Sequence, residues 1–156
     1  DDPLLIHLDD KIKLQQLMRS NSSTASTCWP LGFILPDEAA LLKDESCGEQ
    51  GRSWILKTAT GYGSHGNRIV TKLEALDVAA LDSSNYLCQK MISPSLLING
   101  RKFSMRVYVY YFADGDVYLS KLGLVKFASE KFVQDSDQID NRMYMTNSGR
   151  DDFTLQ

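Results

Sequence analysis

The sequence predicts an α+β (α/β) fold, because amphipathic helical segments alternate with short runs rich in β-branched and aromatic residues. Two further observations favour this class: a hairpin pattern in the second half of the chain, and a glycine cluster directly after one of the extended runs. The 156 residues are 43% hydrophobic and 24% charged, ordinary values for one globular domain with a modest core. No apolar run approaches the roughly 20 residues that a membrane-spanning helix needs, so we expect no membrane partner.

The N-terminal part contains two predicted helices. Residues 10–19 carry apolar residues at positions 12, 14, 17 and 18, which is the spacing of a helical face. A Ser/Thr-rich stretch then predicts a linker, so we expect residues 1–28 to be a helix with a linker and residues 29–156 to form the main domain. A second helix is predicted over 37–45, where an acidic pair occupies its N-terminus.

Several extended segments and a third helix follow. Residues 33–35, 53–57, 67–71 and 86–92 are extended in character, and residues 73–81 predict a helix. Residues 103–112 and 117–122 predict a β-hairpin, because Asp-Gly between two such runs is a strong turn signal.

The first strand of this hairpin carries a row of polar side chains. Because side chains alternate along a strand, Lys102, Ser104 and Arg106 share one face, about 6.6 Å apart, and apolar residues occupy the other. Two cations at this spacing can bind a phosphate chain or a carboxylate. From the strand alone, a merely solvated polar face is the favoured reading.

Charge is distributed unevenly along the chain. The net charge is -3 and the pI is about 5.3, which argues against a nucleic-acid partner bound through bulk charge. Residues 90–126, however, contain six basic residues against two acidic ones. This basic segment within an acidic chain indicates a local anionic ligand, with a solvated mixed-charge surface as the alternative.

Cysteine and histidine usage excludes other kinds of site. The three cysteines, Cys28, Cys47 and Cys88, are odd in number and far apart, which suits thiols in a reducing compartment better than a disulfide scaffold or a zinc site. The two histidines, His7 and His65, are too few for a histidine metal cluster. Ser64 lacks the Gly-x-Ser-x-Gly elbow of many hydrolases, so hydrolase chemistry is not expected.

A glycine cluster follows the strand that ends near Lys57. Gly61-x-Gly63-x-x-Gly66 matches the dinucleotide fingerprint in letters, but the residues after it are extended where that motif requires a helix. A protein kinase is excluded for two reasons. In kinases the ATP-binding lysine follows the glycine loop, whereas Lys57 precedes it here, and the sequence contains no HRD or DFG motif. A strand-borne lysine followed by a glycine loop is the order of ATP-grasp enzymes, and an ordinary surface loop is the alternative.

Read together, four segments resemble the tubulin tyrosine ligase-like family, a branch of the ATP-grasp ligases. The similarity covers residues 29–149 and is most specific in the third of these segments. They are a proline-bounded run (28–38), Trp-Ile-Leu-Lys-Thr with the glycine loop (54–69), the long run from Gln89 to Val109, and Tyr-Met-Thr-Asn (144–147).

The resemblance implies part of the ATP-grasp central lobe and the start of the C-terminal lobe. The family's magnesium ligands, an Asp and a later Glu-x-Asn, are expected beyond Gln156, so no metal ligand is expected within this sequence. We therefore expect these residues to be an internal piece of a longer protein, incomplete as a domain and inactive alone.

The resemblance also implies roles for individual residues. Lys57 would neutralise the α- and β-phosphates of ATP, and Gly63 and Gly66 would belong to the loop that covers them. Lys102 and Arg106 would reach the γ-phosphate and the acyl-phosphate, and Lys126, the third expected catalytic residue, stands where the family usually has an arginine. Gln89 and Lys90, with the backbone of Met91 and Ile92, would line the adenine pocket, and Thr146 and Asn147 would lie near the nucleotide and the incoming amino acid.

The sequence departs from the family pattern at four positions. Ser104 stands in place of an aspartate, which weakens one polar contact to the nucleotide. Arg68 replaces a loop glycine, and Tyr144 replaces a histidine. Lys126 keeps the charge of the usual arginine but not its bidentate fork.

The function implied is that of an ATP- and Mg²⁺-dependent ligase that joins a free amino acid to a protein carboxylate. The expected acceptor is tubulin, whose acidic tail would suit the basic segment 90–126. The expected setting is the cytoplasm, cytoskeleton or cilium. A non-catalytic scaffold that binds nucleotide or tubulin is the alternative, which Ser104 and Tyr144 favour.

Overall fold

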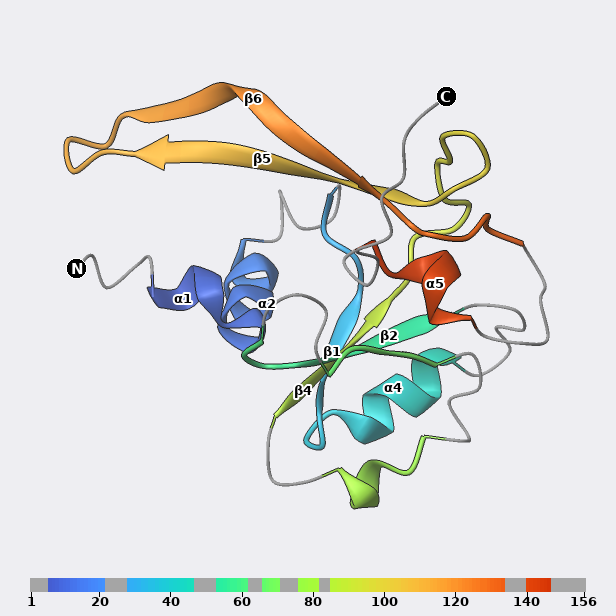
Figure 1. Ribbon diagram of the computed structural model, residues 1–156. Coiled ribbons are helices and arrows are strands. Elements are labelled where there is room, and N and C mark those ends of the chain that lie inside the picture. Colours follow the sequence, from blue (N-terminus) through green and yellow to red (C-terminus); the bar gives the residue numbers. More distant parts are fainter. Residues whose placement is uncertain are drawn as a thin grey trace. The chain divides into compact units, whose positions relative to one another are not determined.

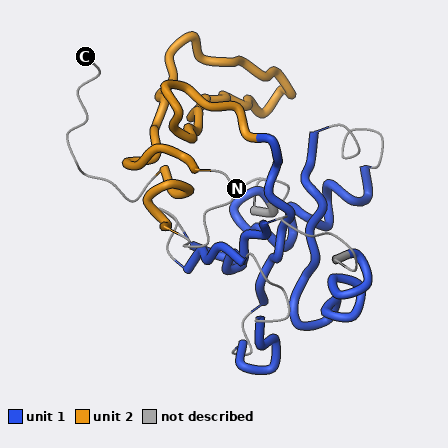
Figure 2. The backbone as a smooth tube through the Cα atoms, turned by 90° about the vertical axis from the view of Figure 1, so that its right-hand side faces the viewer, with its two compact units in different colours: residues 1–94 blue, residues 95–156 orange. Residues whose placement is uncertain are grey.

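The computed structural model describes residues 6–21, 28–46, 53–61, 66–70, 76–81, 85–133 and 140–146 (Figure 1). Its contacts divide the chain into two compact units, unit 1 (residues 1–94) and unit 2 (residues 95–156) (Figure 2). Both contain antiparallel β-structure and helix, which confirms a mixed α/β fold. The division predicted after residue 28 falls inside unit 1 and stays a prediction.

Unit 1 is built on a four-stranded antiparallel sheet with the strand order β1-β4-β2-β3. Its strands are β1 (Gly32–Leu35), β2 (Trp54–Thr58), β3 (Arg68–Val70) and β4 (Tyr86–Lys90). They confirm the extended segments predicted from the sequence. The central pair β4 and β2 is in register with Ile55 opposite Gln89, and β1 places Gly32 on the other side of Gln89.

Helices cover both faces of this sheet (Figure 1). Because side chains alternate along each strand, Trp54, Leu56 and Cys88 point to one face, where they pack with Leu42 of α4 (Ala39–Ser46). The opposite face packs against α2 (Lys11–Ser20), in a cluster of Ile12, Ile34 and Leu87. Burial in this core raises the pKa of the Cys88 thiol to about 12.

Polar contacts fix the ends of α2. The preceding Asp10 is the N-cap, and its carboxylate accepts hydrogen bonds from the backbone of Ile12 (2.8 Å) and Lys13 (3.1 Å). Near the other end, Arg19 forms an ion pair with Glu38 at 2.6 Å and donates to the carbonyl of Gly32. These contacts hold the helix against β1, and they confirm the helix predicted over 10–19.

Two predicted helices differ from the observed ones. The second starts at Ala39 instead of residue 37, because residues 36–38 form a turn in which the backbone N–H of Glu38 donates to the carbonyl of Ile34 (2.8 Å). The prediction of a helix over 73–81 is wrong for its described part. One 3-10 turn, Val78–Ala80, is present there. It begins at residue 78, where the Asp77 carboxylate caps the backbone N–H groups of Ala79 and Ala80, and it ends where the backbone of Leu81 is extended.

Unit 2 contains the predicted hairpin and one short helix, α5 (Asn141–Tyr144). The hairpin strands are β5 (Phe103–Tyr111) and β6 (Val117–Phe127), so the second strand is longer than predicted. The turn has Gly115 at a φ of 93°, and its N–H donates to the carbonyl of Phe112 (3.0 Å). A positive φ is the reason that glycine is suited to this position.

Apolar side chains of the hairpin are exposed on both strands. Met105 is 69% exposed and Leu122 is 79% exposed. The sequence assigns a polar and an apolar face to β5. In unit 2 the side chains of both faces, including the apolar ones, are exposed. Among the described residues, no helix is long and apolar enough to cross a membrane.

Candidate functional site

Two residues predicted to bind nucleotide meet on one face of the unit 1 sheet. Lys57 on β2 and Gln89 on β4 lie diagonally across the strand pair, and the Lys57 ammonium donates to Oε1 of Gln89 at 2.7 Å. Gln89 is 5% exposed, and its amide nitrogen donates to the carbonyl of Pro30 at 3.3 Å. The second hydrogen bond orients the amide, so that its oxygen faces the lysine.

A second cation, Lys11, lies beside this pair and was not predicted. The Lys11 ammonium donates to the carbonyl of Gly61 (3.0 Å), the first glycine of the cluster, and the Lys11 backbone N–H donates to the carbonyl of Ala59 (3.0 Å). Burial and, to a smaller extent, the charge of Lys11 lower the pKa of the Lys57 ammonium. One feature of the sequence could have indicated Lys11. A lysine in the first turn of a helix is unfavourable next to the positive end of the helix dipole, which suggests a role other than helix stability.

Lys11, Lys57 and Gln89 together form a half-buried site suited to an anion. Two cations share a region of reduced hydration, where an anionic group gains more from Coulomb attraction than it does in water. Gly66, at the end of the glycine cluster, has a φ of 74°, and a Cβ there would lie 2.8 Å from Cγ2 of Thr58. Gly63 belongs to this cluster but lies outside the described residues, as do Ser64 and His65.

The residues expected around adenine do not all point in one direction. Lys90 lies opposite Trp54 on the other face of the sheet from Gln89, with its ammonium 5.9 Å from the Trp54 ring and 3.8 Å from Glu45. Met91 follows β4 and its N–H donates to the carbonyl of Ser53 (3.0 Å). Ile92 is exposed. The roles of these residues therefore stay predictions, with only Gln89 next to Lys57.

In unit 2, the predicted catalytic cations are arranged around the β5–β6 pair. Ser104 lies directly opposite Lys126 in the ladder, so that these two side chains share a face, and Arg106 is two residues further along the same face. The Ser104 hydroxyl is hydrogen-bonded to the hydroxyl of Thr146 at 2.7 Å. Unit 2 thus brings Thr146 to the predicted polar row, while Asn147 lies outside the described residues.

Lys102, directly before β5, is held between two aromatic rings. Its Nζ lies 4.2 Å from the centroid of Phe132 and 4.6 Å from that of Tyr144. Burial lowers the pKa of this ammonium. Tyr144, one of the departures from the family pattern, is thus in direct contact with a predicted catalytic residue.

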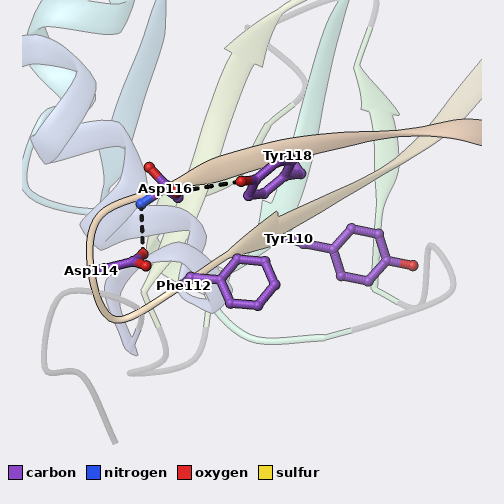
Figure 3. A pocket seen from close by; sticks show the side chains of 5 residues that line it. All are labelled: Tyr110, Phe112, Asp114, Asp116 and Tyr118. Atoms are coloured by element: carbon purple, nitrogen blue, oxygen red, sulfur yellow. Dashed lines mark hydrogen bonds between the residues drawn. The ribbon is translucent and has the colours of Figure 1, made fainter.

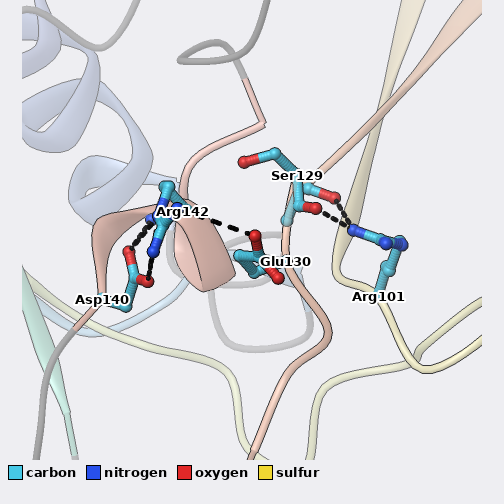
Figure 4. Close-up of polar contacts among 6 residues, drawn as sticks. Arg101, Ser129, Glu130, Asp140 and Arg142 are labelled. Carbon is cyan, nitrogen blue, oxygen red and sulfur yellow. Dashed lines mark hydrogen bonds and ion pairs between the residues drawn. The ribbon is translucent and has the colours of Figure 1, made fainter. Parts of the chain in front are cut away.

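A polar cluster fixes the short helix that carries Tyr144 (Figure 4). Asp140 is its N-cap, accepting from the backbone of Arg142 at 2.9 Å, and the hydrogen-bonded Arg142 guanidinium lowers the pKa of the Asp140 carboxyl. Arg142 also pairs with Glu130 at 3.7 Å. Arg101 donates to the carbonyls of Ala128 (3.1 Å) and Ser129. This cluster ties α5 to the chain after β6.

Two pockets in unit 2 contain none of the predicted site residues. One, of about 440 Å³, lies at the hairpin tip and is lined by Tyr110, Phe112, Asp114, Asp116 and Tyr118 (Figure 3). The other, of about 630 Å³, borders the polar cluster at Arg101, Glu130 and Arg142.

Nothing in the described part of the chain fits a metal ion. No group of three or more His, Cys, Asp or Glu side chains is close enough to hold one there. Magnesium therefore remains an expectation from the resemblance, and the chemistry below includes no step through a metal.

Comparison with known proteins decides the family. The model of the tubulin-tyrosine ligase family matches residues 4–153 of this chain. The chain belongs to the tubulin-tyrosine ligase family. The resemblance read from the four sequence segments is thereby confirmed.

Individual relatives are similar over most of the chain. It is 30% identical over 132 residues to a probable alpha-tubulin polyglutamylase, Ttll1, of Tetrahymena thermophila, covering 76% of this chain and 32% of the relative. Human tubulin monoglutamylase TTLL4 is 31% identical over 122 residues, covering 76% of this chain and 10% of that protein. The human probable tubulin polyglutamylase TTLL2 is 31% identical over 143 residues, covering 86% and 23%. The chain spans about a third or less of the length of these relatives.

Proposed function

We propose that this chain is the nucleotide-binding part of an ATP-dependent ligase that adds an amino acid to a carboxylate of tubulin. The observation that carries the proposal is the hydrogen bond of Lys57 to Gln89 beside Lys11. It joins, in one half-buried site, two residues that the family resemblance assigns to the nucleotide. Membership of the family supports the same reaction class.

Glutamate is the proposed amino acid. The relatives described above are named as tubulin glutamylases, two of them polyglutamylases and one a monoglutamylase. The acidic tail of tubulin would complement the six basic residues of segment 90–126. A tubulin substrate also favours the cytoplasm, the cytoskeleton or the cilium as the setting.

The chemistry assigned to unit 1 is charge neutralisation. The acceptor carboxylate takes the γ-phosphoryl group of ATP, with release of ADP, and becomes an acyl-phosphate. The amine of the free amino acid then attacks its carbonyl carbon, and inorganic phosphate leaves as the amide bond forms. Lys57 and Lys11 would offset the negative charge of the phosphates. Gln89 holds the Lys57 ammonium by its amide oxygen, so that this cation needs little reorganisation when an anion arrives.

The chemistry assigned to unit 2 is stabilisation of the transferred group. Lys102, Arg106 and Lys126 would contact the phosphoryl oxygens as charge moves from ATP to the carboxylate. Thr146 would lie near the nucleotide, with its hydroxyl oriented by Ser104 at 2.7 Å.

A non-catalytic scaffold that binds nucleotide or tubulin is the second candidate. One observation favours it: Ser104 stands where the family usually has aspartate, and its hydroxyl is already engaged with Thr146. A hydroxyl has no negative charge, so it accepts a weaker hydrogen bond from a donor group of the nucleotide than a carboxylate would.

The test is transfer of labelled glutamate to tubulin by the full-length protein, together with ATP binding measured by calorimetry. Replacing Lys57 (Lys57→Met) should reduce ATP-dependent incorporation about 100-fold, because one charge-stabilising group is removed. Two single variants on helix α2 form a matched comparison. Lys11→Met should weaken ATP binding, whereas the control Lys13→Met should leave it unchanged. Unchanged transfer in Lys57→Met contradicts the proposal. ATP binding without any transfer by the unmodified protein supports the scaffold.

A further inference from the structure

The contacts of Lys102 differ from those of the other described lysines at the candidate site. The ammonium of Lys57 is hydrogen-bonded to an amide oxygen, and that of Lys90 lies near a carboxylate. In the part of the chain that the structure describes, the Lys102 ammonium contacts ring faces instead, at 4.2 Å from Phe132 and 4.6 Å from Tyr144.

Ring faces can hold a cation without neutralising it. A carboxylate would cancel the charge of the ammonium and would occupy its N–H groups, which an incoming anion would then have to displace. The attraction of an aromatic face is weaker and uses no hydrogen bond. As far as the described residues go, the charge and the N–H donors of Lys102 thus stay available to an anionic group, while the side chain is confined.

The two rings are themselves held in place. Phe132 and Tyr144 meet edge to face, with centroids 5.5 Å apart and planes at 88°. The backbone N–H of Phe132 donates to the carbonyl of Gly100 at 2.8 Å. Tyr144 closes α5, which the Asp140 cap and the ion pair of Arg142 with Glu130 attach to the same segment. The rings therefore form a preorganised support for the lysine.

We propose that Phe132 and Tyr144 are positioning residues that fix the Lys102 ammonium for contact with a phosphoryl group and that, among the described residues, leave it without a carboxylate beside it. The inference rests on the proposed function, because it assumes that Lys102 binds the nucleotide. It assigns to Tyr144 a role in ATP binding through Lys102, at a position where the resemblance gives only a departure from the family's histidine.

The same hairpin unit offers a matched control. Phe112 and Tyr118 form another edge-to-face pair, with centroids 5.6 Å apart and planes at 87°. No lysine lies over these two rings among the described residues. A substitution of Phe112 by leucine therefore removes a ring from a pair of nearly the same geometry without affecting Lys102.

The first experiment tests the contact without any nucleotide. Reductive methylation of the full-length protein with ¹³C-formaldehyde gives each lysine an NMR signal, and Lys102→Arg identifies the one from Lys102. This signal should be shifted upfield by the two ring currents. Tyr144→Leu should remove much of the shift, while Tyr144→Phe and Phe112→Leu should leave it unchanged. A Lys102 signal at the position of exposed lysines overturns the proposal.

The second experiment measures the affinity of the unmethylated protein for a non-hydrolysable ATP analogue, and the kcat/KM for ATP. Tyr144→Leu should weaken binding about fivefold, as expected for loss of one cation–π contact, and should lower kcat/KM by at least as much, because Lys102 is assigned to the transferred phosphoryl group. Tyr144→Phe should restore the affinity, and Phe112→Leu should not change it. An affinity that Tyr144→Leu leaves unchanged overturns the proposal, even if the ring-current shift is present.

The variant Lys102→Met separates the two hypotheses. If it leaves the affinity for the analogue unchanged, the nucleotide role of Lys102 is wrong, and the positioning role falls with it although the ring-current shift persists. If Lys102→Met weakens binding and Tyr144→Leu does not, the proposed function stands and the positioning role alone is overturned.

Discussion

In unit 1 the sheet is covered by α2 on one face and α4 on the other, whereas in unit 2 the β5–β6 hairpin leaves apolar side chains of both strands exposed. Leu56 of β2 is 0% exposed, and Leu122 of β6 is 79% exposed. Both are leucines on antiparallel strands. The difference comes from a second layer, which unit 1 contains and the hairpin lacks among the described residues of unit 2.

The two units also support their functional lysines in different ways. Lys57 projects from a strand that is packed on both sides, and one amide oxygen fixes its ammonium. Lys102 precedes an exposed hairpin and is held by local ring contacts. A functional side chain therefore needs a rigid support, and a nearby pair of rings can supply it where a buried sheet does not.

The largest expected effect tests the difference in burial between Leu56 and Leu122. Leu56→Ala should lower the free energy of unfolding by about 2–5 kcal/mol, because it opens a cavity in the closed core. Leu122→Ala removes the same atoms from a side chain that is mostly in water, so it should change the free energy of unfolding by less than about 0.5 kcal/mol. Urea unfolding followed by circular dichroism measures both. Equal losses would show that Leu122 is buried in solution.

A smaller effect sharpens the description of the hairpin through its glycines. A Cβ at Gly123 would lie 2.7 Å from the carbonyl oxygen of Arg106, whereas a Cβ at Gly115 would meet nothing within 4 Å. Gly123→Ala should therefore cost about 2 kcal/mol by forcing the strands apart. Gly115→Ala should cost about 1 kcal/mol, through its positive φ alone.

Hydrogen exchange of the β5 and β6 amides is the suitable measurement for these glycine variants. Gly123→Ala should speed exchange around Arg106, and Gly115→Ala should do so mainly at the turn. Gly115→Asn should be milder than Gly115→Ala, because asparagine tolerates this backbone conformation. Slower exchange in Gly123→Ala than in the unmodified protein would contradict the close approach of the two strands.

The smallest effect concerns the ion pair that holds α2 against β1. The hydrogen-bonded Arg19 guanidinium lowers the pKa of Glu38 below its ordinary value of 4.5. The stabilisation is therefore present above the unfolded-state pKa and is lost as pH falls through the lower folded-state pKa. Glu38→Gln should cost about 1 kcal/mol near pH 7. The difference from the unmodified protein should shrink in acid.

Tryptophan fluorescence can follow this pH dependence, because Trp29 and Trp54 both lie in unit 1. The neighbouring variant Asp37→Asn removes a charge without breaking the pair and should have little effect at either pH. A Glu38→Gln difference that grew as pH fell would contradict the sign worked out above.

Local patterns in the sequence predicted most of the elements. The hairpin followed from β-branched and aromatic runs around Asp114-Gly115, and the helix over 10–19 from its apolar spacing. The helix expected over 73–81 was wrong in its described part, because the Asp77 cap starts a turn only at residue 78 and the extended backbone of Leu81 ends it. Apolar spacing alone does not reveal where a cap and an extended residue limit a helix.

The candidate site was predictable in part. The order of Lys57 and the glycine cluster, together with the family resemblance, pointed to the residues that the structure brings together. Lys11 was missed, because only the docking of α2 on the sheet places it beside Gly61. The faces of Gln89 and Lys90 follow from strand alternation. The exposure of the hairpin's apolar positions does not, since burial depends on what packs above a strand.

The position of β4 in the sheet has a consequence for the order in which unit 1 can form. Among the described strands, β4 is the last of unit 1 in the sequence, but it lies between β1 and β2 and is the one partner of β1. Until residues 86–90 have left the ribosome, none of these described strands is available to pair with β1. The hairpin β5–β6, in contrast, closes over one short turn, and such local pairing is fast. The slow stage of folding therefore belongs to the unit that is synthesised first.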